Sequence, residues 1–114
     1  MQTDTSQAVK LPEAVAAYFA ADLGNSSGVA QSFTEHAVVI DEGREHRGRR
    51  AIARWKAEAT AKYHYTSEPL SVEALGADIV VRARLTGDFH GSPIERQYRF
   101  ALEGTEIARL EITA

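Results

Sequence analysis

The first part of the chain has apolar residues at helical spacing. Pro12 suits the first turn of a helix, where its missing N–H leaves no hydrogen bond unmade, and Gly24 suits a C-cap. The pattern therefore predicts a helix over residues 12–23. A second, short helix is expected next, with Val29 and Phe33, four residues apart, on its buried face.

Helical spacing returns over residues 49–62, after a predicted hairpin. The hairpin has strands over 37–42 and 44–47, joined by a Glu-Gly turn, and the first strand is rich in β-branched residues. The helix over 49–62 has a buried stripe made of Ile52, Trp55 and Ala59.

From residue 63 onward the hydrophobic period changes from helical to strand-like. Four strands are predicted, over 63–75, 79–89, 94–102 and 106–112. Pro69 interrupts the first of them and indicates an edge strand or a bulge. Short turns make consecutive strands antiparallel. A strongly curved sheet wrapped over the helices is then the simplest way to bury the helical stripes.

These elements predict one α+β domain over 11–114, with a flexible tail over 1–10. The 114 residues suffice for one core, and the lack of cysteine excludes thiol chemistry and favours the cytoplasm. The net charge of −3 argues against nucleic-acid binding, and neither a signal peptide nor a membrane span is expected. The arginines at 44, 47, 49 and 50 alternate with Glu42 and Glu45, which favours a solvated turn over a phosphate site.

Four segments of the chain carry a resemblance to a known family. They are Val15-Ala-Ala-Tyr18-Phe19, Phe33-Thr-Glu-His-Ala37-Val-Val-Ile-Asp41, Arg47-Gly48-x-x-Ala51-Ile52-x-x-Trp55 and the closing hairpin from Gly91 to Ile112. Together they resemble the SnoaL-like and ketosteroid-isomerase-like branch of the nuclear transport factor two-like superfamily. The resemblance implies a cone-shaped, cystatin-like α+β barrel, in which a curved antiparallel sheet wraps around three N-terminal helices. It also implies a pocket for a small hydrophobic organic ligand and a homodimer through the outer sheet face. The reaction stays open, because this fold hosts many functions.

Asp41 is the first candidate for catalysis. It shares a strand face with Ala37 and Val39, so it faces a pocket if they do. In the steroid isomerases that the chain resembles, the general base is a carboxylate eight residues after the Phe that ends helix two, and Phe33 to Asp41 has this spacing. The alternative is an acid at the strand end that caps the following turn.

Tyr18 and Arg96 are the other two catalytic candidates. Tyr18 lies on the buried stripe of the first helix, where the isomerases carry the Tyr that stabilises an oxyanion; the alternative is a core tyrosine. On the second-last strand those enzymes use a protonated Asp two residues before an aromatic. The matching residue here is Arg96, before Tyr98, and a one-residue bulge would place Glu95 there instead. An inward Arg96 favours an anionic ligand or intermediate, or an ion pair with Asp41.

Several apolar residues are candidates for ligand binding, although core packing explains them equally well. They are Phe19, Phe33, Val39, Trp55, Tyr98 and Phe100. His36 or His46 could serve Asp41 as a proton partner, but solvation of both is favoured. No histidine pair has metal-motif spacing, and neither a metal nor a cofactor is expected. Limonene-type epoxide hydrolases share the fold and use an Asp–Arg–Asp set; Arg82 and Arg84 lack the acids of that set.

Three hypotheses follow from the sequence. The first is a cofactor-independent acid–base enzyme that isomerises, cyclises or dehydrates a small hydrophobic carbonyl or enol compound. In it Asp41 is the base, Tyr18 donates a hydrogen bond to oxygen, and Arg96 orients the substrate. The second is a non-catalytic protein that binds a small molecule, and the third is a dimeric assembly domain with a filled pocket.

Overall fold

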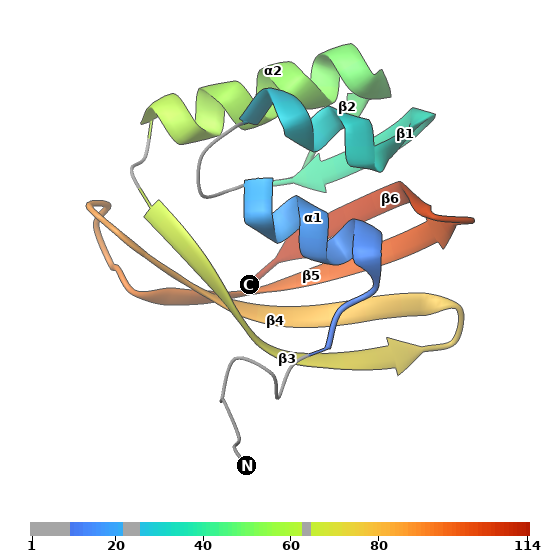
Figure 1. Ribbon diagram of the computed structural model, residues 1–114. Coiled ribbons are helices and arrows are strands. Elements are labelled where there is room, and N and C mark those ends of the chain that lie inside the picture. The colour runs from blue at the N-terminus through green and yellow to red at the C-terminus, as the bar shows by residue number, and fades with distance from the viewer. Residues whose placement is uncertain (1–9, 22–25, 63–64) are drawn as a thin grey trace.

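A computed structural model describes residues 10–21, 26–62 and 65–114 of the chain (Figure 1). Most of the tail expected over 1–10 lies outside these residues. So do Leu23 and Gly24, the expected end and cap of the first helix, and the first two residues of the strand expected over 63–75.

The described residues form three helical segments and six strands, and the first two strands lie between the second and third helical segments. They are α1 (Glu13–Ala21), the 3-10 helix η2 (Ser26–Ser32), β1 (Phe33–Asp41), β2 (Arg44–Arg47), α2 (Gly48–Lys62), β3 (Tyr65–Leu75), β4 (Asp78–Gly87), β5 (Ile94–Glu103) and β6 (Glu106–Thr113). This is the α+β order that the sequence predicts, with the helices on the N-terminal side of the four long strands.

Phe33 differs from its expected place at the end of the second helix. It is the first residue of β1, fully buried, and pairs with Ile107 of β6. The expected strand began only at residue 37, because the polar run over 34–36 hides the alternation. The register between β1 and β6 shifts between Phe33 and Val38, so this polar run occupies an irregular stretch of the strand.

The six strands form one sheet in the order β2-β1-β6-β5-β4-β3. The strands β3 to β6 form the predicted antiparallel meander. The first hairpin joins this meander by parallel pairing of β1 with β6. Pro69 lies in β3, which is an edge strand whose register shifts between Pro69 and Ser71, so both features that the proline indicated are present.

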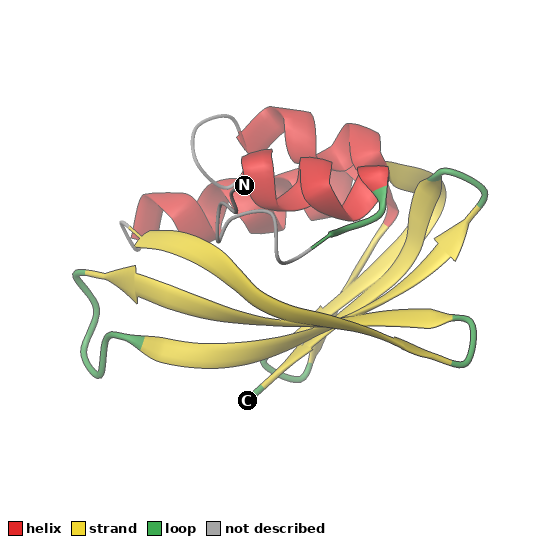
Figure 2. Ribbon diagram, turned by 60° about the horizontal axis from the view of Figure 1, so that its bottom comes forward, coloured by secondary structure: helices red, strands yellow, loops and turns green. Residues whose placement is uncertain are grey.

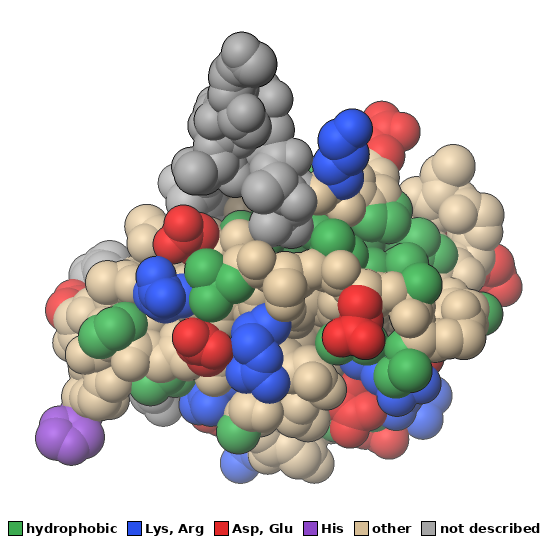
Figure 3. Space-filling model, turned by 90° about the horizontal axis from the view of Figure 1, so that it is seen from below, with side chains coloured by type: hydrophobic (Ala, Val, Ile, Leu, Met, Phe, Trp, Pro, Cys, Tyr) green, Lys and Arg blue, Asp and Glu red, His purple; other side chains and the backbone are tan. Residues whose placement is uncertain are grey.

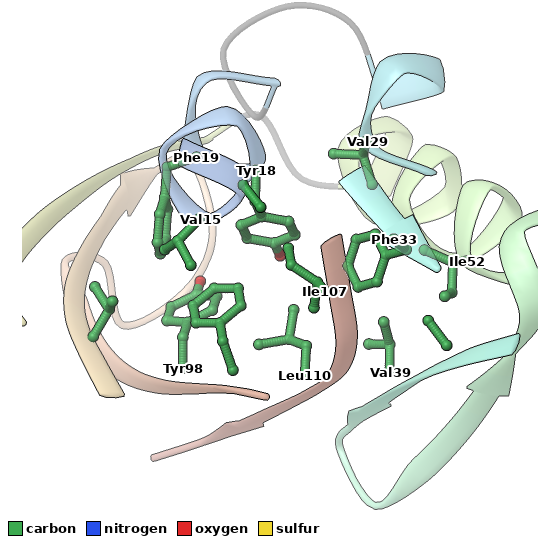
Figure 4. Packing of buried hydrophobic residues seen from close by; sticks show 14 of the residues in the cluster. Val15, Tyr18, Phe19, Val29, Phe33, Val39, Ile52, Tyr98, Ile107 and Leu110 are labelled. Carbon is green, nitrogen blue, oxygen red and sulfur yellow. The ribbon is translucent and has the colours of Figure 1, made fainter. Parts of the chain in front are cut away.

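The sheet is curved, and the helices cover its concave face (Figure 2). Tyr18 and Phe19 of α1 point down onto Tyr98 of β5, with the centre of the Phe19 ring 5.0 Å from that of Tyr98 (Figure 4). Phe33 and Ile52 close the core at the other end, beside β1. The core therefore lies between the helices and the sheet, as the helical stripes predict.

The outer face of the sheet is charged. Oppositely charged side chains are intermixed on the face seen from below (Figure 3). Four ion pairs between strand residues are Glu68–Arg84, Asp78–Arg99, Arg82–Glu95 and Arg109–Glu111. Such exposed pairs contribute little stability, typically about 0–1 kcal/mol each, and serve mainly to keep the face hydrated. No helix in the described part of the chain has the length and apolar character needed to cross a membrane.

Candidate functional site

A cavity of about 510 Å³ lies between the concave face of the sheet, α1 and α2. Its size falls within the range of small-molecule pockets, roughly 300–1,000 Å³. Every long strand of the sheet and both α-helices contribute side chains to its wall. The charged and histidine lining residues are Asp41, Glu42, Arg44, His46, Lys56, Glu58, His90 and Arg96.

Asp41 is the last residue of β1 and is half-buried in the cavity wall. Ala37 and Val39 of the same strand face are fully buried, so the strand alternation carries Asp41 to the inner side of the sheet. The indole Nε1–H of Trp55 on α2 donates a hydrogen bond of 3.0 Å to Asp41 Oδ2. This bond ties the carboxylate to a buried helix residue and fixes its orientation.

Asp41 lines the cavity, and the hydrogen bond from Trp55 uses only one of its two carboxylate oxygens. Within the described residues, the Asp41 carboxylate makes no hydrogen bond other than the one from Trp55, and no ion pair with Arg96 or another cation. A carboxylate oriented through one oxygen can accept a proton on the other. The expected alternative of a turn-capping acid is not what the side chain does here, because its carboxylate bonds to Trp55 and not to the turn.

Tyr18 lies on α1 with 1% of its surface exposed, and it also lines the cavity. Its ring contacts other aromatic rings edge-on, with ring centres 5.2 Å from Phe19 and 5.6 Å from Phe100. Tyr18 therefore packs in the core and also borders the cavity, and its role toward a ligand stays a prediction.

Lys56 is a site residue that the sequence reasoning missed. It is the one charged residue among those described that is buried, at 2% exposure, and it lines the cavity. Its Nζ donates a hydrogen bond of 2.9 Å to the Tyr65 hydroxyl and lies 5.1 Å from the centre of the Tyr18 ring and 5.4 Å from that of Trp55. Aromatic faces stabilise an ammonium group and offset part of its cost of burial.

A signal for Lys56 was present in the sequence. Ile52, Trp55, Lys56 and Ala59 follow the i, i+3, i+4, i+7 pattern, so Lys56 belongs to the buried stripe of its helix. A buried stripe that is identified from apolar residues alone omits Lys56. The burial of a lysine on such a stripe is itself unusual, because charged side chains are almost never fully buried without partners.

Arg96 faces the cavity, and Glu95 does not. Arg96 and its neighbours Ile94 and Tyr98 on one face of β5 line the cavity. Glu95 is exposed on the other face and lies 3.6 Å from Arg82. No bulge interrupts the pairing of β5 with β4 at this point, since Ala83 pairs with Arg96 and the register runs on without a shift. The strand alternation thus settles which of the two residues is turned inward.

The six residues expected to bind a ligand divide into two groups. Trp55 and Tyr98 line the cavity. The other four belong to the core beneath it and are not among the lining residues: Phe19, Phe33, Val39 and Phe100. They occupy the buried face of their elements, but side chains nearer the cavity cover them. Further apolar and aromatic lining is supplied by Ala59, Tyr65, Leu85, Phe89, Ile94 and Ile112.

The structure places His46 in the cavity wall but not His36. His46 pairs with Val39 in the first hairpin and lines the cavity, with its ring centre 5.8 Å from that of Trp55. His36 is exposed. Arg82 and Arg84 pair with acids on the outer face, away from the cavity, so they take no part in this site. The described residues contain no cluster of three His, Asp or Glu side chains suited to hold a metal ion.

Comparison with known proteins places the chain in a family. No protein-family model and no curated protein matches it. Among solved structures, a candidate polyketide cyclase from Sinorhizobium meliloti is 38% identical, over 97% of this chain and all of that one, with a TM-score of 0.86. A protein with a ketosteroid isomerase-like fold from Catenulispora acidiphila is 23% identical over 92% of this chain and 87% of that one, with a TM-score of 0.82.

A third solved structure shares the fold. It is a candidate SnoaL-like polyketide cyclase from Jannaschia sp. CCS1, 18% identical over 98% of this chain and 90% of that one, with a TM-score of 0.74. The chain belongs to the SnoaL-like and ketosteroid-isomerase-like branch of the nuclear transport factor two-like superfamily. The resemblance drawn from its sequence is therefore confirmed.

Proposed function

We propose that the protein is a cofactor-independent acid–base enzyme that moves a proton on a small hydrophobic carbonyl or enol compound. The reaction would be an isomerisation, cyclisation or dehydration, with Asp41 as the general base. The observation that carries this proposal is the Asp41 carboxylate in the cavity wall, which Trp55 orients through one oxygen while the other has no hydrogen bond to any described residue.

The first step of such a reaction removes a proton from the carbon next to the carbonyl group. Asp41 takes the proton, the C–H electron pair moves into the carbonyl group, and an enolate oxygen gains negative charge. In an isomerisation, Asp41 returns the proton to a different carbon of the conjugated enolate. In a cyclisation, the enolate carbon attacks an electrophilic carbonyl carbon of the same molecule, and the oxygen of that group takes the proton. In a dehydration, the enolate expels a β-hydroxyl group, which leaves as water with that proton. The protein must therefore supply a base on one side and hydrogen-bond donors or positive charge on the other.

The candidate donors come from α1, α2 and β3. Tyr18 keeps the role that the sequence suggested, as a phenol that borders the cavity. The Lys56–Tyr65 pair adds an ammonium group and a second phenol to the same wall, joined by their 2.9 Å hydrogen bond. In a site shielded from water, a fixed positive group stabilises a developing enolate more than it would in solution.

The relatives agree with this proposal without specifying the substrate. The Sinorhizobium meliloti protein, 38% identical, is described as a candidate polyketide cyclase. Cyclisation of a polyketide is one of the reactions that begin by forming an enolate. The mixed apolar and aromatic lining here suits a flat ligand of two or three rings.

Deuterium exchange on a simple ketone tests the proposal without knowledge of the substrate. The bicyclic ketone 2-tetralone has acidic α-hydrogens, and 2-naphthol mimics its enol. We expect the wild-type protein in D₂O to accelerate the loss of the α-hydrogen NMR signals of 2-tetralone above the buffer rate. We also expect 2-naphthol to inhibit this exchange and to raise the thermal stability of the protein by mass action.

Two other results would point to the alternatives. Stabilisation by 2-naphthol without accelerated exchange would identify a binding protein that does no acid–base chemistry on these compounds. Failure of both, together with a dimer in light scattering, would favour an assembly domain whose outer sheet face forms the interface.

Trp55 is predicted to be a positioning residue for Asp41. Trp55→Phe keeps an aromatic ring but removes the Nε1–H that donates to Asp41 Oδ2. Because the carboxylate then samples unproductive orientations, we expect kcat for 2-tetralone exchange to fall about tenfold, with KM nearly unchanged. If Trp55 had a purely structural role, the substitution would lower thermal stability without lowering kcat selectively over KM. An unchanged kcat in a folded Trp55→Phe variant would contradict the prediction.

A further inference from the structure

We propose that the ligand of this cavity carries a carboxylate group, which Arg96 binds. The inference deepens the function proposed above and rests on it for the identity of the reacting group: the substrate would be a hydrophobic oxo acid, with its carbonyl end near Asp41 and its carboxylate at Arg96.

Arg96 has no counter-ion in the described part of the protein. It is half-buried in the cavity wall, and its guanidinium group makes neither a hydrogen bond nor an ion pair with any described residue. Other arginines of the sheet show the contrast: Arg82, Arg84, Arg99 and Arg109 each pair with an acid on the outer face. A guanidinium group has five N–H donors and no acceptor, so a partly buried one favours an anionic partner.

The charge balance of the cavity interior points the same way. Of the charged lining residues, Glu42, Arg44 and Glu58 are exposed at the mouth. The interior is left with two cations, Lys56 and Arg96, and one carboxylate, that of Asp41. A bound monoanion would balance the excess positive charge, whereas a neutral ligand would desolvate Arg96 without replacing its water.

The register places the two ends of the site apart. Asp41 and Tyr98 flank Ile112 on neighbouring strands, so their Cα atoms lie two strand spacings, about 10 Å, from each other. Arg96 is two residues before Tyr98 on β5, which moves it by roughly 7 Å along the strand, at right angles to the first separation. Apolar and aromatic side chains, those of Ile112, Tyr98 and Ile94, line the wall between and beyond these charges.

This spacing explains how a base and an anion can share one cavity. A carboxylate bound at Arg96 is separated from Asp41 by the width of a ring system, so repulsion between the two anions is weak. The bidentate geometry of an arginine–carboxylate pair would also fix the direction of the ligand. The carbon to be deprotonated would then be held at the Asp41 end.

A matched pair of probes tests the inference. The acid 6-hydroxy-2-naphthoate and its carboxamide differ in charge but have the same shape and the same phenol. By calorimetric titration, we expect the wild-type protein to bind the acid about 10- to 100-fold more tightly than the amide. Arg96→Met should abolish this preference and leave the affinity for the amide nearly unchanged. Arg84→Met, which removes an arginine from the outer face, is the matched control and should behave as wild type.

Each result decides for or against the inference. Equal binding of acid and amide by the wild type would overturn it, as would a preference that survives in Arg96→Met or is lost equally in Arg84→Met. If Arg96→Met does not fold, Arg96→Gln and Arg96→Lys replace it: the first should lose the preference, and the second should keep part of it.

The inference and the proposed function can fail separately. An Arg96-dependent preference for the acid, in a protein that does not exchange the α-hydrogens of 2-tetralone, would keep the carboxylate site and reject the acid–base enzyme. Exchange that depends on Asp41, in a protein with no preference for the acid, would do the reverse.

Discussion

Asp41→Asn is expected to slow the exchange of the 2-tetralone α-hydrogens by about 10²- to 10⁴-fold. The amide has nearly the same shape as the carboxylate, and its oxygen can still accept the 3.0 Å hydrogen bond from the Trp55 indole. What it lacks is the ability to take a proton. The change therefore removes the chemistry and leaves the geometry in place, so the variant should still bind 2-naphthol and unfold at nearly the wild-type temperature.

Glu58→Gln is the matched control for Asp41→Asn. Glu58 also lines the cavity, but it is exposed at the mouth, on α2. Neutralising it changes the charge of the cavity by the same amount as neutralising Asp41. We expect exchange to stay close to the wild-type rate. An equal loss of exchange activity in both variants would show that the negative charge of the cavity matters and that Asp41 is not the base. A fully active Asp41→Asn variant would rule out Asp41 as the general base.

Leu110→Ala is expected to lower the free energy of unfolding by about 2–5 kcal/mol. Leu110 is fully buried in β6, a central strand of the sheet, where it pairs with Val39 on one side and Phe100 on the other (Figure 4). Truncation leaves a cavity that a closely packed core cannot refill. For a domain of this size the melting temperature should fall by roughly 10–20 °C in differential scanning calorimetry.

Leu75→Ala makes the same chemical change at an exposed position. Leu75 lies at the end of the edge strand β3 with 48% of its surface exposed. We expect its removal to change the free energy of unfolding by no more than about 0.5 kcal/mol. Similar losses of unfolding free energy in the two variants would mean that Leu110 is not closely packed in the core.

Strand alternation was the most informative signal in the sequence for the site. It predicted that Asp41 shares the face of Ala37 and Val39, and the structure turns Asp41 into the cavity. The same alternation places Arg96 with Ile94 and Tyr98 once no bulge interrupts β5. These inferences succeed because a period of two leaves only two directions for a side chain, and one of them is toward the core.

Periodicity could not tell cavity from core. Phe19, Phe33, Val39 and Phe100 lie on the predicted buried faces, but the structure fills the space around them with other side chains. Whether a buried face borders packed atoms or open volume depends on how far apart the covering helices lie. That distance is set by tertiary packing between segments, which no local pattern reports.

Two further features were out of reach for related reasons. Lys56 lies on a predicted stripe, but the aromatic groups around its ammonium come from three elements, with Tyr18 on α1, Trp55 on α2 and Tyr65 on β3. The parallel pairing of β1 with β6 joins residues about seventy positions apart, such as Asp41 and Ile112. Turn residues predict the pairing of strands that are neighbours in sequence, but they give no information about strand partners that lie this far apart in the chain.

That parallel pairing also governs the order of events during synthesis and folding. β1 has only the short strand β2 beside it until β6 has been made, because β6 supplies the whole of its other side. Loop closure over such a separation is slow compared with formation of the antiparallel meander. We therefore expect the half of the sheet with Asp41 to dock late onto the half with Arg96. A nascent chain that stops before β6 lacks the strand that joins the two halves, so it cannot assemble the site.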